Sequence, residues 1–251
     1  MTDPEPRLRV AVFRPDDERL VEAVDLLDSL GATPVGDPML DVRPTDAVPR
    51  SDADYAILTS KTGVELAADA GWDPGDTEVV AIGERTASEL RGAGYEVSHV
   101  PEEYSSEGLV EYLADRVDGR RVEVARSDHG SPVLTNGLED AGAYVHETIL
   151  YRLVRPESAG ESAALAAAGD LGAALFTSSL TVQHFLDAAE DRGVREDALA
   201  GLETAVVGAI GEPTRETAES LGVSVDVVPE SADFESLATE VVEAAAPTYH
   251  E

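Results

Sequence analysis

The sequence predicts an α/β protein composed of two similar domains, each built around a parallel β-sheet. Short apolar runs that are rich in β-branched residues alternate along the chain with amphipathic segments of helical period. Strands separated by helices favour parallel sheets with right-handed crossovers. The alternating pattern occurs twice within 251 residues, a length that supports two small hydrophobic cores.

Each expected element follows from a local pattern. Residues 9–13 form a short apolar run typical of a buried strand, and residues 19–30 carry apolar side chains at helical spacing. Residues 160–172 are rich in alanine, which favours a helix. The remaining expected strands are residues 54–58, 78–82, 95–100 and 144–150, and the remaining expected helices are residues 63–70, 86–93 and 106–117.

An internal repeat relates the two halves of the pattern. The run AILTS at residues 56–60 resembles ALFTS at 174–178, and VAIGERT at 80–86 resembles GAIGEPT at 208–214. The strand RVAVFR at residues 9–14 likewise resembles RVEVAR at 121–126. The matches are short, but they keep the same order along the chain. They therefore indicate two copies of one supersecondary unit.

Acidic residues dominate the charge of the chain. There are 51 Asp and Glu against 18 Lys and Arg, which gives a net charge of −33, and Lys61 is the only lysine. We favour a halophilic surface adapted to molar salt over an acidic surface that recruits a cationic partner, because the acidic residues are spread along the whole length. The same charge argues against a nucleic-acid partner, which requires basic surface.

Composition also excludes several kinds of chemistry. The chain has no cysteine, so disulfides, thiolate catalysis and cysteine-bound metals are excluded. Its five histidines lack metal-ligand spacing, so no metal site is expected, and the glycine fingerprints of dinucleotide and P-loop sites are absent. No apolar run is long enough to cross a membrane, and the first residues lack the features of a signal peptide. We therefore expect a cytoplasmic protein without a membrane partner.

Polar residues recur where a predicted strand gives way to a helix. In open α/β sheets ligands bind at this edge, where helix N-termini present free N–H groups to an anion. Ser and Thr at such junctions are usually helix caps, and Thr86 with Glu89 fits a capping box. Capping and anion binding can coexist, so both interpretations stay open. The residues concerned are Ser60, Lys61, Thr62, Gly83, Thr86, Ser105, Ser178, Ser179, Gly211 and Thr214.

Four side chains have alternative interpretations. Arg14 and Arg126 occupy matching strand ends, either as anion clamps or as partners of nearby acids. Lys61 is interpreted as a cation near an anion site rather than as a Schiff-base lysine. Tyr151, at the end of a predicted strand, is by default a half-buried packing residue.

These motifs together resemble the uroporphyrinogen-III synthase family. The run ILTSKTGV at residues 57–64 resembles the family's strand and T-S-x-N-G-V turn, and AIGERTA at 81–87 resembles its I/V-G-x-x-T-A segment. Arg126, Leu138, the Gly-Ala pair at 142–143 and Tyr151 follow its R-G…L…G-A…Y-R stretch, and FTSS at 176–179 is similar to a second-domain turn. The likeness extends over most of the chain. It departs at Thr62, where the family usually has Asn, and at the Glu-Pro pair 212–213.

The resemblance implies a specific fold and reaction. Residues 1–36 with 157–251 would form one domain and residues 38–152 the other. A two-stranded hinge near residues 36–38 and 152–160 would join them, with the active-site cleft between the domains. A monomer would convert hydroxymethylbilane, a linear tetrapyrrole, to uroporphyrinogen III without a cofactor, with loss of water and inversion of ring D. The product would enter haem, sirohaem and corrinoid synthesis.

The resemblance also implies residue roles. Tyr151 would assist departure of the substrate hydroxyl as a neutral proton donor. Arg14, Arg126 and the turn residues given above would bind the substrate, in part through their backbone amides. The alternative function is a cytoplasmic two-domain binding module for a small anionic ligand. A nucleotide-dependent transferase is disfavoured because the glycine motifs are missing.

Overall fold

The computed structural model describes residues 8–246, which form two compact units. Unit 1 holds the described residues up to Asp41 and from Val154 onward, and unit 2 holds Val42–Leu153. The chain passes from one unit to the other in strand β3 (Asp41–Pro44) and in strand β7 (Tyr144–Val154), which are neighbours in one sheet. The mixed α/β class with parallel sheets is thus confirmed. No described helix is long and apolar enough to cross a membrane.

The first crossing from unit 1 to unit 2 lies later in the chain than the hinge predicted near residues 36–38. Asp37 and Met39 are both buried in unit 1, at 3% and 0% exposure. Asp37 accepts hydrogen bonds from the backbone of Gly160 and Ser162, and Met39 packs into the apolar core. These contacts keep the chain in unit 1 after the preceding strand has ended, so the division falls at Asp41.

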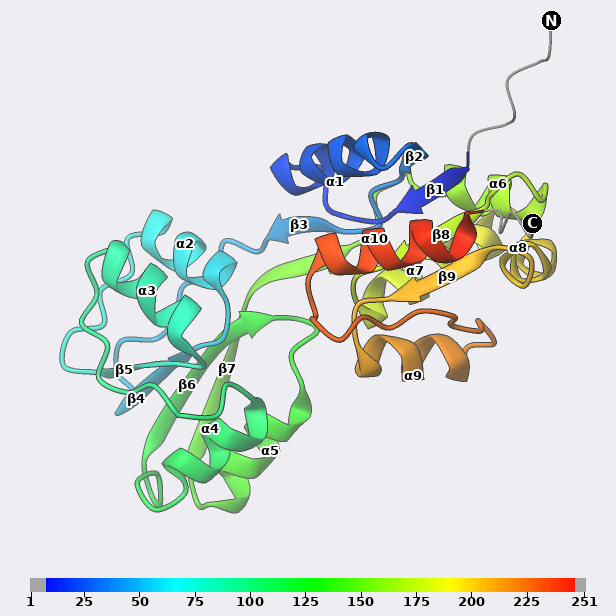
Figure 1. Ribbon diagram of the computed structural model, residues 1–251. Coiled ribbons are helices and arrows are strands. Elements are labelled where there is room, and N and C mark those ends of the chain that lie inside the picture. Colours follow the sequence, from blue (N-terminus) through cyan, green and yellow to red (C-terminus); the bar gives the residue numbers. More distant parts are fainter. Residues whose placement is uncertain (1–7, 247–251) are drawn as a thin grey trace, which may run out of the picture. The chain divides into compact units, whose positions relative to one another are not determined.

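Unit 1 is a three-layer unit around a four-stranded parallel sheet of order β2-β1-β8-β9 (Figure 1). Helices α1 and α10 cover one face, and α6, α7, α8 and α9 cover the other. The strands are β1 (Arg9–Val12), β2 (Thr33–Gly36), β8 (Ala173–Phe176) and β9 (Val206–Ala209). The helices are α1 (Glu18–Ser29), α6 (Glu161–Ala167), α7 (Ser179–Asp191), α8 (Arg195–Leu202), α9 (Glu212–Ser220) and α10 (Phe234–Ala245).

The alternation of side chains along β1 explains the two cores of unit 1. Val10 and Val12 belong to the core beneath α1 and α10, whereas Ala11 and Phe13 belong to the core on the opposite face. The Phe13 ring stacks on Phe176 with the ring centroids 4.7 Å apart. This contact fixes the carboxyl ends of β1 and β8 against each other, which is the edge where a ligand is expected.

Unit 2 follows the same plan with a five-stranded sheet of order β3-β7-β6-β4-β5 (Figure 1). Neighbouring strands from β7 to β5 pair in parallel. Helices α2 and α3 cover one face, and α4 and α5 cover the other. The remaining strands are β4 (Tyr55–Leu58), β5 (Glu78–Ala81) and β6 (Arg121–Ser127). The helices are α2 (Lys61–Asp69), α3 (Glu84–Gly92), α4 (Ser106–Leu113) and α5 (Pro132–Asp140).

The repeat seen in the sequence corresponds to equivalent positions in the two units. Gly94 and Gly222 each follow the end of a helix, α3 and α9, with φ of 91° and 88°. Residues other than glycine rarely adopt this left-handed conformation, which ends a helix and starts the return of the chain. The two copies therefore share their backbone turns as well as their strand order.

The prediction of a strand at residues 95–100 is wrong. Only His99 pairs with the sheet, through a single parallel bridge to Val80. Tyr95 and Val97 pack instead against the core beneath α2 and α3, and the Tyr95 hydroxyl donates to the Trp72 carbonyl. The apolar side chains of this segment thus face the core next to the sheet, and the backbone does not continue the ladder.

Candidate active site

The candidate site is the carboxyl edge of each sheet, where the helices that follow the strands begin, among them three in each unit at matching places of the repeat. In unit 2 these helices are α2, α3 and α4, and in unit 1 they are α7, α9 and α10. Helix N-termini carry unpaired N–H groups and the positive end of the helix dipole, which favour a bound anion. The N-cap residues are Ser60, Gly83 and Ser105 in unit 2 and Ser178, Gly211 and Asp233 in unit 1.

The three serines at these positions cap their helices. Ser60 Oγ accepts a hydrogen bond from the Gly63 N–H at 3.0 Å, and Ser105 Oγ accepts one from the Gly108 N–H at 2.9 Å. Ser178 forms a reciprocal capping box with the third residue of α7. Each hydroxyl satisfies one N–H group, and the other N–H groups of the first turn remain without a helical partner.

Thr86 does not cap its helix, and the capping-box prediction for it is wrong. Helix α3 begins at Glu84 after Gly83, so Thr86 is the third helical residue and is only 5% exposed. Thr214 occupies the equivalent position in α9 and is 4% exposed. In both turns one isoleucine separates the strand from the glycine, and the helix starts directly after the glycine. The two threonines are therefore buried behind the first turn.

The two glycine turns differ in what surrounds them. A Cβ atom on Gly83 would lie 3.0 Å from the side chain of Tyr104, so this exposed tyrosine covers the turn. A Cβ atom on Gly211 would contact only Pro213 at 4.0 Å, and a cavity of about 500 Å³ borders this turn together with Arg215. Sequence reasoning missed Arg215 because it has no basic counterpart in the first copy of the repeat.

Tyr151 and Ser60 form the most specific polar contact at the edge of unit 2. Tyr151 pairs with Ser127 across β7 and β6, and its hydroxyl lies 3.0 Å from Ser60 Oγ. The tyrosine is 7% exposed, so its phenol is largely shielded from bulk water. Because Ser60 Oγ already accepts from Gly63, its own hydrogen is available to the phenol oxygen. Either hydroxyl can be the donor in this pair, and when Ser60 donates, the phenol hydrogen is free for a ligand.

Arg126 is engaged by protein groups. It is 5% exposed, forms an ion pair with Glu147 and donates to the Ser131 carbonyl at 2.6 Å. Of the two interpretations of this residue, the partner of a nearby acid is the one that the contacts match.

Arg14 has a donor that is not used. Its guanidinium carbon lies 4.3 Å from the centroid of the Phe234 ring, and its buried Nε has no hydrogen-bond partner among the described residues. Burial lowers the pKa of Arg14 from its ordinary value, and the charge of Arg19 acts in the same direction. An anion at the carboxyl end of β1 would supply the missing hydrogen bond and offset the desolvation.

Three further predicted residues lie at the first turns of α2 and α7. Lys61 begins α2, and its Nζ lies within 3.6 Å of carboxylates on α2 and α3, so its charge is balanced inside unit 2. Thr62 follows it and is half-buried. Ser179 begins α7 and donates to the Pro213 carbonyl at 3.0 Å, which ties the starts of α7 and α9 together.

These features define a class: a duplicated α/β protein whose sheet edges carry helix N-termini, a position that favours a bound anion. Among residues 8–246, no group of three or more His, Asp or Glu side chains is arranged to hold a metal ion. Residues 21–239 match the profile of the family described as Uroporphyrinogen-III synthase HemD. The chain belongs to this family, and the resemblance inferred from its motifs is confirmed.

Individual relatives agree with the family assignment. A provisionally named uroporphyrinogen-III synthase of Methanothermobacter thermautotrophicus is 33% identical over 237 residues, covering 88% of this chain and 92% of its own. A uroporphyrinogen-III synthase of Synechococcus elongatus is 30% identical over 186 residues, covering 70% of each chain. The crystal structure of a mutant uroporphyrinogen III synthase from Thermus thermophilus superposes with a TM-score of 0.68 at 20% identity, covering 95% of this chain and 98% of its own. That similarity shows a shared fold.

Proposed function

We propose that the chain cyclises hydroxymethylbilane to uroporphyrinogen III, with loss of water and inversion of ring D. The observation that carries the proposal is the hydrogen bond between Ser60 and Tyr151 at a helix N-terminus, in a chain of this family. The enzyme would be a cyclising hydro-lyase that acts in the cytoplasm as a monomer. Its product would serve tetrapyrrole synthesis toward haem, sirohaem and corrinoids.

Binding of the substrate relies on main-chain donors. Hydroxymethylbilane carries eight carboxylates, and the net charge of −33 on the chain opposes its approach. The helix N-termini at the two sheet edges and the unused donor of Arg14 supply local positive potential. We propose that these donors hold the substrate carboxylates, because a flexible tetrapyrrole must be held in one folded geometry before its ends can react.

Tyr151 would act as the proton donor. Its phenol gives a proton to the departing hydroxyl, which leaves as water, and the Ser60 hydroxyl donates to the phenolate that develops. Attack through the substituted carbon of ring D gives a spiro intermediate, which fragments and recloses with that ring inverted. The proton lost from the ring carbon in the last step returns to the phenolate, so the chain leaves the cycle unchanged.

The isomer of the product tests this function. The chain is incubated with enzymatically generated hydroxymethylbilane in high salt, and the oxidised porphyrins are separated by chromatography. We expect isomer III with the chain and isomer I in the matched reaction without it, because unguided closure does not invert ring D. A binding module for a small anion, the alternative function, would yield isomer I in both reactions and would refute the proposal.

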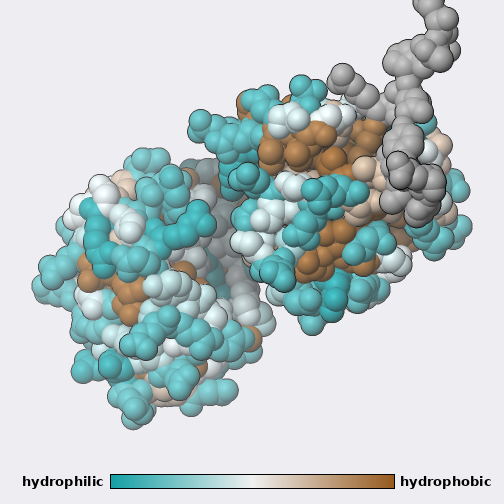
Figure 2. Space-filling view, in the orientation of Figure 1, coloured by the Kyte–Doolittle hydropathy of each residue, from teal (hydrophilic) through white to brown (hydrophobic). Residues whose placement is uncertain are grey.

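We also propose that the acidic surface is an adaptation to high salt. Figure 2 shows hydrophilic residues distributed over the visible face of both units. With a net charge of −33, self-repulsion destabilises the compact state until salt screens it. The Debye length falls from about 30 Å at 0.01 M salt to about 3 Å at 1 M.

The melting temperature, followed by circular dichroism, is therefore expected to rise from 0.01 M to molar KCl. Sucrose at equal osmolarity is the control, because it strengthens apolar burial without screening charge. A melting temperature that stays constant across the KCl series would contradict halophilic adaptation.

A further inference from the structure

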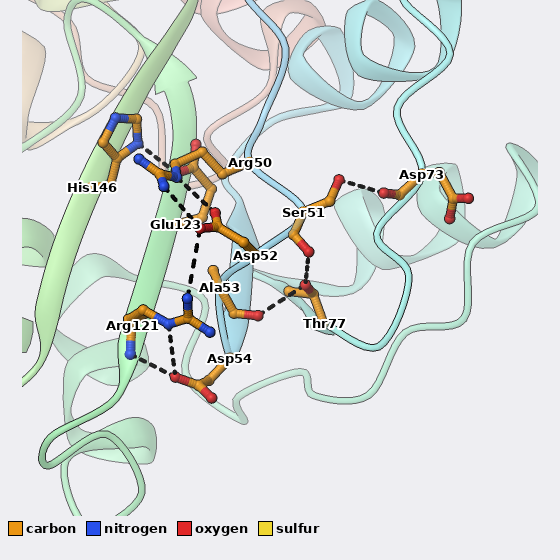
Figure 3. Close-up of polar contacts among 10 residues, drawn as sticks. All are labelled: Arg50, Ser51, Asp52, Ala53, Asp54, Asp73, Thr77, Arg121, Glu123 and His146. Atoms are coloured by element: carbon orange, nitrogen blue, oxygen red, sulfur yellow. Dashed lines mark hydrogen bonds and ion pairs between the residues drawn. The ribbon is translucent and has the colours of Figure 1, made fainter.

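A second pocket lies at the amino edge of the unit 2 sheet, opposite the carboxyl edge that carries the candidate active site. It has a volume of about 210 Å³. The first residues of β6 and β7, apart from the exposed Arg121, form its floor and walls, and the exposed Arg50 and Arg121 form its rim. Figure 3 shows the polar side chains at this edge, with Arg50, Glu123 and His146 close together. None of the residues assigned to the candidate active site lines the pocket.

Glu123 contributes a buried carboxylate with one unused oxygen. Its side chain is 0% exposed. Its Oε2 lies 2.6 Å from His146 Nδ1, and the two residues are direct partners across β6 and β7. Its Oε1 has no hydrogen-bond partner among the described residues. An unpaired buried polar group costs about 1–3 kcal/mol, and more when it is charged, so a ligand that donates to Oε1 would be favoured.

The rim of the pocket supplies unused donors. Arg50 donates to Asp52 through Nε and Nη2 at 2.8 and 2.9 Å, and its Nη1 has no hydrogen bond to a described residue. Arg121 lies 3.6 Å from Asp52 and 3.8 Å from Asp54, distances that are longer than hydrogen bonds. The hydrogen bond to Asp52 raises the pKa of Arg50, and the charge of Glu123 contributes in the same direction. The guanidinium on the rim is therefore within electrostatic reach of the carboxylate on the floor.

We propose that this pocket binds a small zwitterionic amino acid, with the ammonium group on Glu123 Oε1 and the carboxylate on the guanidinium groups of Arg50 and Arg121. The charges of the lining match such a ligand, because the two arginines are balanced by Asp52 and Glu123. Two valines in the wall provide apolar contact for a short aliphatic spacer. The site is separate from the proposed synthase reaction and does not depend on it.

Binding of matched small molecules tests the proposal. Glycine and γ-aminobutyrate are titrated calorimetrically into the full chain, in parallel with butylamine and butyrate, which each carry only one of the two charges. At least one zwitterion is expected to bind saturably. Butylamine and butyrate should each bind at least about tenfold more weakly, because each loses one charge-assisted hydrogen bond. No saturable binding of either zwitterion, or equal binding of butylamine or butyrate, would overturn the proposal.

The chain offers a matched pair of variants for the same titration. Glu123→Gln replaces the carboxylate with a neutral amide. It should weaken binding of the zwitterion about tenfold. Glu78→Gln is the control, because Glu78 is half-exposed and pairs with His99 at the same 2.6 Å distance outside the pocket. It should leave the affinity unchanged.

A second variant covers the case in which Glu123→Gln loses its fold, as judged by near-ultraviolet circular dichroism. Arg50 is exposed at the rim, so Arg50→Ala should fold normally and also weaken binding about tenfold. A folded Glu123→Gln or Arg50→Ala variant that retains the original affinity would refute the assigned site.

Discussion

Replacing Tyr151 with phenylalanine is expected to lower kcat for uroporphyrinogen III formation by roughly 100-fold, the lower part of the range for loss of a general acid. Phenylalanine keeps the ring that packs in the core beneath α2 and α3 and removes only the hydroxyl that lies 3.0 Å from Ser60. KM should change little if the phenol acts on the departing hydroxyl and not on substrate affinity. Initial rates at saturating hydroxymethylbilane, with isomer analysis of the product, measure the effect.

Tyr95→Phe is the matched control for this variant. Tyr95 packs against the same core, and its hydroxyl also makes one internal hydrogen bond, to the Trp72 carbonyl. Its removal should lower stability slightly and leave kcat unchanged. If Tyr151→Phe were as active as Tyr95→Phe at saturating substrate, the proton-donor role would be wrong.

The Asp37→Ala variant is expected to lose about 3 kcal/mol of unfolding free energy in unit 1, because several buried donors lose a charged acceptor at once. The Asp37 carboxylate accepts from the Gly160 N–H at 2.9 Å and from the Ser162 N–H at 2.8 Å, and it also accepts from the Ser162 hydroxyl. Gly160 is the N-cap residue of α6 and has the left-handed conformation, with φ of 111°. Because glycine has no side chain, it cannot cap the helix itself. Asp37 therefore caps α6 from a distant part of the chain.

Thermal unfolding followed by circular dichroism checks this expectation, with a decrease in Tm of roughly 10–15 °C for a unit of this size. Asp25→Ala, which removes an exposed carboxylate from α1, is the control for the change in net charge. It should leave Tm nearly unchanged. Equal Tm values for the two variants would show that the buried carboxylate contributes no more than a surface one.

The sequence by itself determined the repeated strand–turn–helix units and the edge on which a ligand is expected. This information is local, because a run such as AILTS combines a buried strand with a serine that can cap the next helix. Ser60 and Ser178 accordingly cap α2 and α7 at equivalent positions. Predictions from local sequence were wrong where neighbouring signals compete. At Thr86 the helix starts earlier, after Gly83. At residues 95–100 the packing of Tyr95 replaces strand pairing.

Only the tertiary structure decided which distant side chains meet. The contact of Ser60 with Tyr151 spans 91 residues, and that of Asp37 with Ser162 spans 125. The first requires β6 to lie between β4 and β7, and the pairing of Glu123 with His146 requires a particular register of β6 on β7. Strand order arises from the packing of whole layers, and the period of apolar residues along one segment does not encode it. Register is set only when the apolar faces of neighbouring strands pack on the same core.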